Sequence, residues 1–153
     1  MPYSEVKLSI DYKMRALCFA PYPNHPKGCP NFGKKKGCPP QAPLVENYLD
    51  LSKPTYAIWN IYDFKSHTDK MRAKHPNWSK RQVDCCLYWQ PTARNSLKEE
   101  ILIFKKEFPK LTIIKCPEAQ GVNLTDTMKS IGHELEWPPE TVTYQIAVAG
   151  EKK

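Results

Sequence analysis

The sequence predicts a fold of the α/β or α+β class, a single-domain sandwich in which helices pack against a mixed sheet. Segments rich in β-branched and aromatic residues alternate with segments whose apolar residues recur at helical spacing. Residue pairs typical of helix N-termini stand where several helical segments begin. The chain of 153 residues has the length of one ordinary domain and contains no internal repeat, so we expect residues 1–153 to form a single domain.

Four segments have the composition of β-strands. Residues 6–10 alternate apolar and polar side chains, as in a half-buried strand. Residues 56–62, Y-A-I-W-N-I-Y, are rich in strand-forming residues and are predicted to lie centrally in the sheet. Residues 111–115 and 142–149 supply two more strands. The order of the four strands in the sheet does not follow from their composition.

Three helical segments are predicted before residue 91. Residues 44–51 carry apolar side chains on one face, and residues 65–74 form a polar, basic segment typical of a surface helix. Ser79 and Gln82 stand three residues apart, which is the spacing of a capping box. They predict a helix that begins there and continues to Gln90.

Two further helices are predicted beyond this point. Pro91 is expected to interrupt or kink the preceding helix, and Ser96 with Glu99 repeats the capping-box spacing. The helix that follows carries an apolar stripe of four residues: Leu97, Ile101, Phe104 and Phe108. Thr125 is predicted to cap a short helix that Gly132 ends.

Residues 18–43 follow neither the helical nor the strand periodicity. This stretch, the cysteine loop, contains Cys18, Cys29 and Cys38 together with seven of the fifteen prolines. A segment this long without regular structure is usually functional or disordered in a small domain. Its cysteine and aromatic content argues against disorder. We therefore expect a metal or a cluster bound by thiolates to hold it.

The cysteines favour an iron–sulfur centre. The spacing C-x10-C-x8-C differs from the paired C-x2-C ligands of zinc modules. Cys29, Cys38 and Cys116 are each followed by proline, as cluster ligands often are. Cys116 also leaves the end of a predicted strand, a usual place for site residues in α/β sheets. The candidate ligands are thus Cys18, Cys29, Cys38 and Cys116, with a [4Fe-4S] cluster as the favoured cofactor and zinc as the alternative.

Cys85 and Cys86 are adjacent on a predicted helix. Neighbouring helical residues point about 100° apart, so only one of the two is expected to serve a common site. Cys86, on the side of Val83 and Leu87, is the preferred one. A buried apolar thiol that binds nothing is the competing interpretation for both cysteines.

Three motifs resemble a family of predicted metal-binding, cysteine-rich proteins of uncharacterised function. They are C-P-N-F-G-K-K-K-G-C-P-P from Cys29, C-P-E-A-Q-G-V-N from Cys116, and T-M-K-S-I-G-H-E-L-E near the end of the chain. The family has a Cys-Pro-Asn-Tyr-Gly-Lys loop that closes in Cys-Pro-Pro, then a Cys…Pro-Glu segment and a Gly-Ile-Asp/Asn helix start. The resemblance covers the cysteine loop and the last third of the chain.

This resemblance implies metal or cluster ligation by Cys29, Cys38 and Cys116. The further cysteines that the family carries around its Cys-Pro-Glu segment are missing here. Their absence leaves Cys18 or Cys86 to complete one site. The resemblance implies no particular reaction.

The net charge of +7 is unevenly distributed. Lys34, Lys35 and Lys36 lie in the cysteine loop, and residues 65–81 hold six basic residues against Asp69. A basic surface beside a metal site indicates an anionic partner, such as a nucleic acid or a nucleotide. A solvated surface is the alternative. Aromatic residues that could stack on bases are Tyr22, Phe32, Trp59, Trp78, Tyr88 and Trp89, although core packing is the commoner role.

Several classes of protein are disfavoured. No P-loop and no dinucleotide-binding G-x-G-x-x-G motif occurs. His133 and Glu134 lack the H-E-x-x-H spacing of zinc hydrolases. The N-terminus lacks the pattern of a signal peptide, and no apolar run approaches the roughly 20 residues that cross a bilayer. We expect a soluble, cytoplasmic protein without a membrane partner.

The sequence offers only candidates for catalytic residues. His25 is a candidate ligand or proton donor in the cysteine loop, and Glu118 is a candidate ligand or general acid/base. A turn histidine and a loop carboxylate are the respective alternatives. Two hypotheses result. One is an iron–sulfur protein that acts on a nucleotide or thiolated base; the other is a zinc-stapled, non-catalytic module that binds nucleic acid through residues 34–36 and 65–81.

Overall fold

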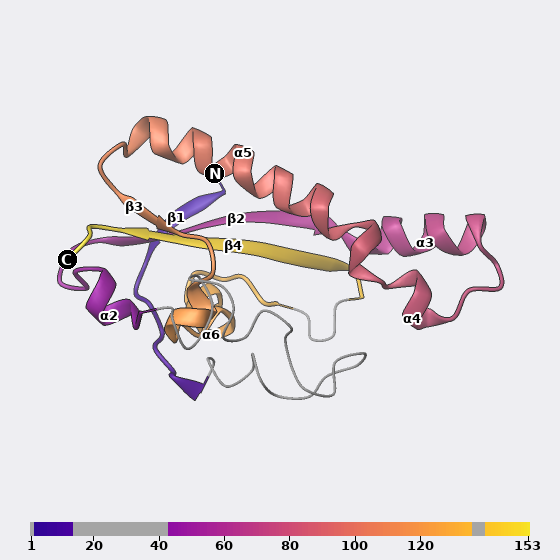
Figure 1. Cartoon of the computed structure of the whole chain (residues 1–153), viewed down its shortest axis with the longest axis horizontal. Coiled ribbons are helices and arrows are strands. Elements are labelled where there is room, and N and C mark those ends of the chain that lie inside the picture. The colour runs from indigo at the N-terminus through magenta and orange to yellow at the C-terminus, as the bar shows by residue number, and fades with distance from the viewer. Residues whose placement is uncertain (1, 14–42, 136–139) are drawn as a thin grey trace.

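A computed structural model describes residues 2–13, 43–135 and 140–153, and its centre is a four-stranded sheet (Figure 1). The spatial order of the strands is β1-β2-β4-β3. Their bounds are Tyr3–Val6 for β1, Thr55–Asp63 for β2, Thr112–Ile114 for β3 and Val142–Gly150 for β4. Helices and a sheet thus pack together, as the sequence predicts.

The predicted mixed sheet is wrong, because all three pairings among the described strands are antiparallel. β2 and β3 run in the same direction and are joined by a helical connection, which would ordinarily make them parallel neighbours. In this fold β4 lies between them and pairs with both. The unit is therefore a split β–α–β arrangement.

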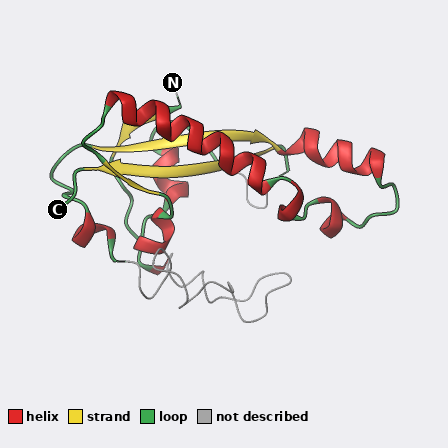
Figure 2. Cartoon of the chain, turned by 45° about the horizontal axis from the view of Figure 1, so that its top comes forward, coloured by secondary structure: helices red, strands yellow, loops and turns green. Residues whose placement is uncertain are grey.

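The two central strands are buried on both faces over residues 57–59 of β2 and 146–150 of β4. Successive strand residues point to opposite sides of a sheet. On one side, Ala57 of β2 and Val148 of β4 join a core with α2 (Val45–Tyr48) and α6 (Leu124–Lys129). On the other, Ile58 of β2 and Ala147 and Ala149 of β4 meet α5 (Gln90–Glu107), which crosses the sheet as Figure 2 shows. Helices on both faces explain why β2 and β4 read as nearly continuous apolar runs.

The helix α5 spans Gln90–Glu107 without a break. Pro91 lies in its first turn, where the missing N–H costs nothing, so the proline starts the helix and does not kink it. The predicted second start at Ser96 is wrong as well, because its hydroxyl donates to the Thr92 carbonyl at 3.3 Å within the helix. The predicted apolar stripe is confirmed: Leu97, Ile101 and Phe104 are buried, and Phe108 is half-buried against them.

Two of the three helices before α5, those predicted at residues 44–51 and 79–90, are shorter than expected, whereas the helix predicted at 65–74 is confirmed. Ser79 and Gln82 form the predicted capping box, but α4 covers only Lys80–Val83 and is followed by the 3-10 turn η1 at Cys86–Tyr88. The preceding helix α3 spans Phe64–Lys74 and is capped by the Asp63 carboxylate. The first strand also ends earlier than predicted, at Val6.

The short helix α6 begins one residue earlier than the predicted cap. Asn123 is its N-cap, and the side-chain oxygen of Asn123 accepts from the Asp126 N–H at 3.1 Å. Gly132 follows the helix with a φ of 86°, a left-handed conformation that suits the predicted stop. None of the helices in the described part of the chain is long and apolar enough to cross a membrane.

Candidate metal centre

Cys116 is the residue of the predicted ligand set that the structure describes in full. It follows β3 and is the N-cap of η2, a 3-10 helix over Pro117–Gln120. The residue is exposed to solvent. Pro117 occupies the first turn, and Gly121 ends it with a φ of 91°. The Cys-Pro-Glu motif therefore forms a compact turn that holds the thiol at a strand end, where the sequence predicts it.

Backbone hydrogen bonds link the turn after Cys116 to the chain that enters the cysteine loop. The Asp11 N–H donates to the Gly121 carbonyl at 2.7 Å, and the Asn123 N–H donates to the Ser9 carbonyl at 2.7 Å. Between these bonds Ile10 and Val122 form an isolated antiparallel bridge. The predicted alternation at residues 6–10 is thus used partly in β1 and partly in this bridge. Residues 9–11 consequently lie directly beside the segment that carries Cys116.

The chain that leaves the cysteine loop returns to the same place. The Glu46 carboxylate of α2 accepts a hydrogen bond from the Tyr12 phenol and raises the pKa of that phenol. Tyr48, two residues after Glu46 at the end of α2, lines a pocket with Cys116 and Gln120. Both ends of the segment 14–42 are therefore adjacent to each other and to Cys116.

Gly121 is required by this arrangement. Its left-handed φ is one that side-chain-bearing residues rarely adopt. A Cβ added to Gly121 would lie only 2.5 Å from Cδ1 of the Tyr12 ring. The ring of Tyr12 thus packs flat against the backbone of the turn, and no side chain fits between them.

We expect Gly121→Ala to destabilise the protein more than Gly132→Ala. Both glycines have positive φ, so each alanine variant should lose roughly 1–2 kcal/mol from the backbone conformation. Only at Gly121 does the new methyl group meet another side chain, because nothing lies within 4 Å of a Cβ at Gly132. Urea denaturation of both variants would measure the difference. Equal losses would mean that Tyr12 does not pack on this turn.

The pocket beside Cys116 has a volume of about 260 Å³ and is lined in part by Gln120. Gln120 is only 9% exposed, yet its Oε1 has no hydrogen-bond partner among the described residues. A buried acceptor without a partner costs free energy. Lys115 also lines the pocket and adds a positive charge. Nothing in the sequence distinguished Gln120 or Tyr48 as site residues.

Glu118, a predicted candidate acid, lies on η2 beside this site. Desolvation by the surrounding protein raises the pKa of its carboxyl group above the ordinary value, although the residue is exposed as a whole. A raised folded-state pKa means that the folded protein binds the proton more tightly than the unfolded chain does. Folding stability therefore falls as pH rises from about 4.5 through the folded pKa.

We expect Glu118→Gln to remove this loss of folding stability with rising pH. The variant should match the wild type below pH 4.5, where both side chains are neutral, and should be equally or more stable at neutral pH. Urea unfolding of both metal-free proteins across this pH range would measure their free energies of unfolding. A wild type that gains stability relative to the variant as pH rises would contradict the assignment.

The other predicted site residues are not brought together with Cys116 in the described structure. Cys85 is half-buried and lies after α4, whereas Cys86 begins η1 and its side chain is outside the described part. The predicted shared helical face is wrong, because α4 ends at Val83 and Leu87 is 78% exposed. The described residues hold no group of three or more His, Cys, Asp or Glu side chains placed to bind a metal ion.

The remaining predictions lie outside the described residues. They concern the ligands Cys18, Cys29 and Cys38, the candidate His25, and the anion-binding residues Lys34, Lys35 and Lys36. His133, by contrast, is described. Its ring nitrogen Nδ1 lies 3.0 Å from the Tyr144 hydroxyl and its ring packs on Trp59, which is a structural role.

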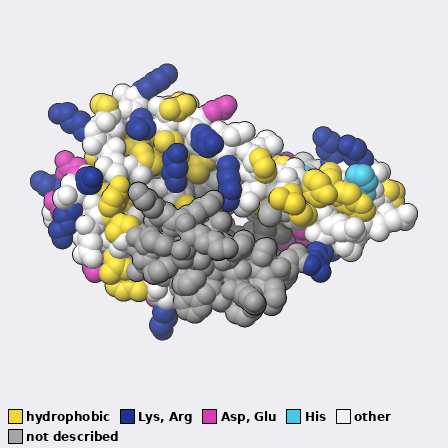
Figure 3. Space-filling model, in the orientation of Figure 1, with side chains coloured by type: hydrophobic (Ala, Val, Ile, Leu, Met, Phe, Trp, Pro, Cys, Tyr) yellow, Lys and Arg dark blue, Asp and Glu magenta, His cyan; other side chains and the backbone are white. Residues whose placement is uncertain are grey.

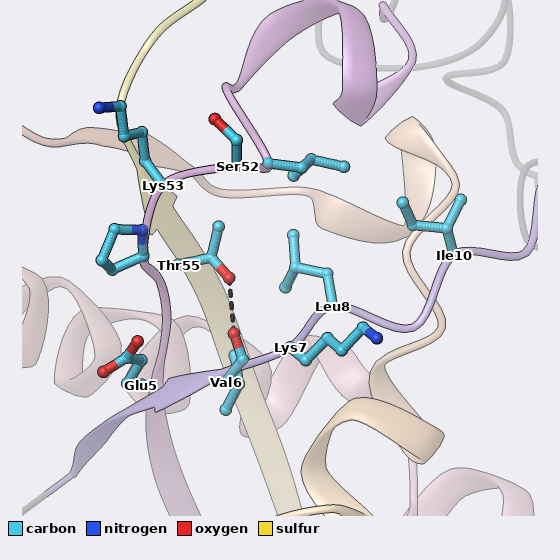
Figure 4. Close-up of a pocket in the computed structure, with 10 residues that line it drawn as sticks. Glu5, Val6, Lys7, Leu8, Ile10, Ser52, Lys53 and Thr55 are labelled. Atoms are coloured by element: carbon cyan, nitrogen blue, oxygen red, sulfur yellow. Dashed lines mark hydrogen bonds between the residues drawn. The ribbon is translucent and has the colours of Figure 1, made fainter.

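A second hollow lies along the edge strand β1. It has a volume of about 460 Å³ and is formed where residues 5–10 face residues 51–55. Thr55 Oγ1 donates to the Val6 carbonyl across it at 2.6 Å, and Leu8 points into it, with Lys7 and Lys53 at its margins (Figure 4). Its lining contains no thiol and no imidazole. The hollow therefore contains none of the residues that the sequence predicts as metal ligands, whereas the pocket beside the Cys116 turn contains Cys116.

No family model, no curated protein and no solved structure matches the chain. The argument for function consequently comes from the residues themselves.

Proposed function

We propose that the protein is a metal-binding protein that holds one [4Fe-4S] cluster on Cys18, Cys29, Cys38 and Cys116. The observation that supports this proposal is that residues 9–11, which enter the segment 14–42, are hydrogen-bonded to the Cys116 turn, and that α2, which follows this segment, contacts Tyr12 through Glu46 and shares a pocket with Cys116 through Tyr48. Three of the four thiols lie in that segment. Ligands from a long loop and from a distant turn can share one centre only if the fold brings the two segments together.

The environment of Cys116 also suits ligation. The thiol is exposed beside a pocket and is not packed into the core, where a structural cysteine would lie. Cys86 is the reserve ligand if Cys18 does not bind. If only three thiolates bind, the cluster would retain an open iron able to act as a Lewis acid on a substrate.

An anionic substrate is the natural occupant of the neighbouring pocket. Lys115 provides a positive charge there, and the unpartnered Gln120 Oε1 would accept a hydrogen bond from an N–H or O–H group. A nucleotide, including one with a thiolated base, carries both a negatively charged phosphate and N–H or O–H donors. Lys34, Lys35 and Lys36 would attract its phosphate.

Anaerobic purification followed by iron, sulfide and zinc analysis tests the proposal. We expect brown protein with about four iron and four sulfide per chain and broad visible absorption. Stoichiometric zinc without colour would instead support the alternative function, a zinc-stapled, non-catalytic nucleic-acid-binding module. Neither metal at stoichiometric amounts would overturn both.

A further inference from the structure

The segment 64–89, the α3–η1 arm, extends past the end of the sheet (Figure 1) and is strongly basic. It contains six Lys and Arg residues and two Asp residues. Both carboxylates are already paired on their own helices, Asp69 with Lys65 and Asp84 with Lys80. Four basic side chains have no ion pair in the described part of the chain: Lys70, Arg72, Lys74 and Arg81.

The arm also carries a row of aromatic rings outside the core. The rings of His75 and Trp78 stack with centroids 3.8 Å apart and planes at 6°, and Tyr88 lies 5.4 Å from Trp78 at 31°. A turn in which the Trp78 N–H donates to the His75 carbonyl folds the first two rings together. The capping box at Ser79 and the turn at η1 then bring Tyr88 to the same side.

Tyr88, at one end of this row, is accessible to a ligand, and His75 and Trp78 are half-buried. Tyr88 is 54% exposed, and the neighbouring Leu87 is 78% exposed. Figure 3 shows hydrophobic side chains gathered on the arm next to a histidine, with Lys and Arg side chains nearby. Aromatic residues of the α5 core differ, because Tyr56, Phe104 and Phe108 pack on one another over the sheet.

Aromatic and basic groups meet in one open pocket. Its volume is about 350 Å³, near the lower end of the range of roughly 300–1,000 Å³ for ligand sites. Its lining includes Trp78 and Tyr88 together with Arg81 and Gln82. An entering planar group would therefore contact ring surface, a guanidinium and a side-chain amide at once.

We propose that the α3–η1 arm binds single-stranded nucleic acid, with a base stacked beside Trp78 and Tyr88 and the backbone phosphates on Arg81 and Lys74. Unpaired bases expose flat faces that aromatic side chains stack on without regard to sequence. Phosphates are neutralised by Lys and Arg that lack other partners. Duplexes hide their base faces, so this surface should prefer single strands. The inference uses none of the four proposed ligands, Cys18, Cys29, Cys38 and Cys116, and does not depend on the proposed function.

Fluorescence anisotropy with a labelled oligothymidylate of about 16 nucleotides tests the inference on the full chain as purified. We expect Tyr88→Ala to weaken binding about tenfold, and Tyr88→Phe to bind as the wild type does, because stacking needs the ring and not the hydroxyl. The double variant Lys74→Gln/Arg81→Gln should lower the slope of log K against log salt by about 1.4, from roughly 0.7 per phosphate contact. An unlabelled duplex of equal length should compete poorly.

Matched controls make the result decisive. Lys105→Gln/Lys106→Gln removes the same charge from the last turn of α5, outside the arm, and should leave the slope unchanged. Circular dichroism and metal content of Tyr88→Ala should equal those of the wild type. The inference is overturned if single strands do not bind, if Tyr88→Ala binds normally, or if the control pair lowers the slope equally. Displacement by poly-glutamate at equal charge would assign the arm to acidic protein segments and would also overturn it.

Discussion

Cys29→Ser and Cys38→Ser should each lose most of the bound metal. A serine hydroxyl does not replace a thiolate as a ligand at neutral pH, and metal binding supplies folding free energy to the segment that it holds. Iron, sulfide and zinc per chain, measured after anaerobic purification, would report the loss. Limited proteolysis should show faster cleavage within residues 18–43 in both variants.

The vicinal cysteines provide the control for this experiment. Cys85 is half-buried within the arm and is not a proposed ligand, so Cys85→Ser should retain its metal. Cys86→Ser should lose metal only if Cys86 completes the site in place of Cys18. Full metal content in both Cys29→Ser and Cys38→Ser would refute the proposed centre.

Phe104→Ala should destabilise the fold by about 3–5 kcal/mol, the usual loss for a phenylalanine truncated in a core. Phe104 is fully buried on α5. The centroid of its ring lies 5.2 Å from that of Tyr3, 5.6 Å from that of Tyr56 and 4.8 Å from that of Phe108. Its removal would leave a cavity between α5 and strands β1 and β2. Urea denaturation followed by circular dichroism would measure the free energy of unfolding.

The neighbouring residue on the same helix is a matched control. Ile103 is 55% exposed on the outer face of α5, so Ile103→Ala should change the free energy of unfolding by no more than about 0.5 kcal/mol. Similar losses in the two variants would mean that α5 does not pack on the sheet through the face that carries Phe104.

Elements that depend on neighbouring residues were predictable from the sequence. The Ser79–Gln82 capping box forms because its two hydrogen bonds join residues three positions apart. The apolar stripe of α5 follows from helical periodicity, and the composition of residues 56–62 indicates the central position of β2 in the sheet. Pro91 was misjudged because a proline in a first turn and a proline that kinks a helix look alike until the helix start is known.

The candidate site was predictable only in part. Cys116 and Glu118 stand out because thiols and carboxylates carry chemistry wherever they lie. Gln120 and Tyr48 do not stand out, since they become site residues only through the pocket that they share with Cys116. Likewise, the sequence contains His75, Trp78 and Tyr88, but only two turns of the folded arm place their rings in one row.

The helical and strand segments of the core, the positive charge of the arm and the thiols available for a metal can be recognised from the amino-acid sequence alone. The tertiary structure decided that β4 separates β2 from β3, and that residues 9–12, α2 and the Cys116 turn meet at one place. The difference lies in how far apart along the chain the interacting residues are. Caps and periodicity act within a few residues, whereas strand order and the bridge between Ile10 and Val122 join residues far apart in the chain. Such pairings exist only when the whole core has formed.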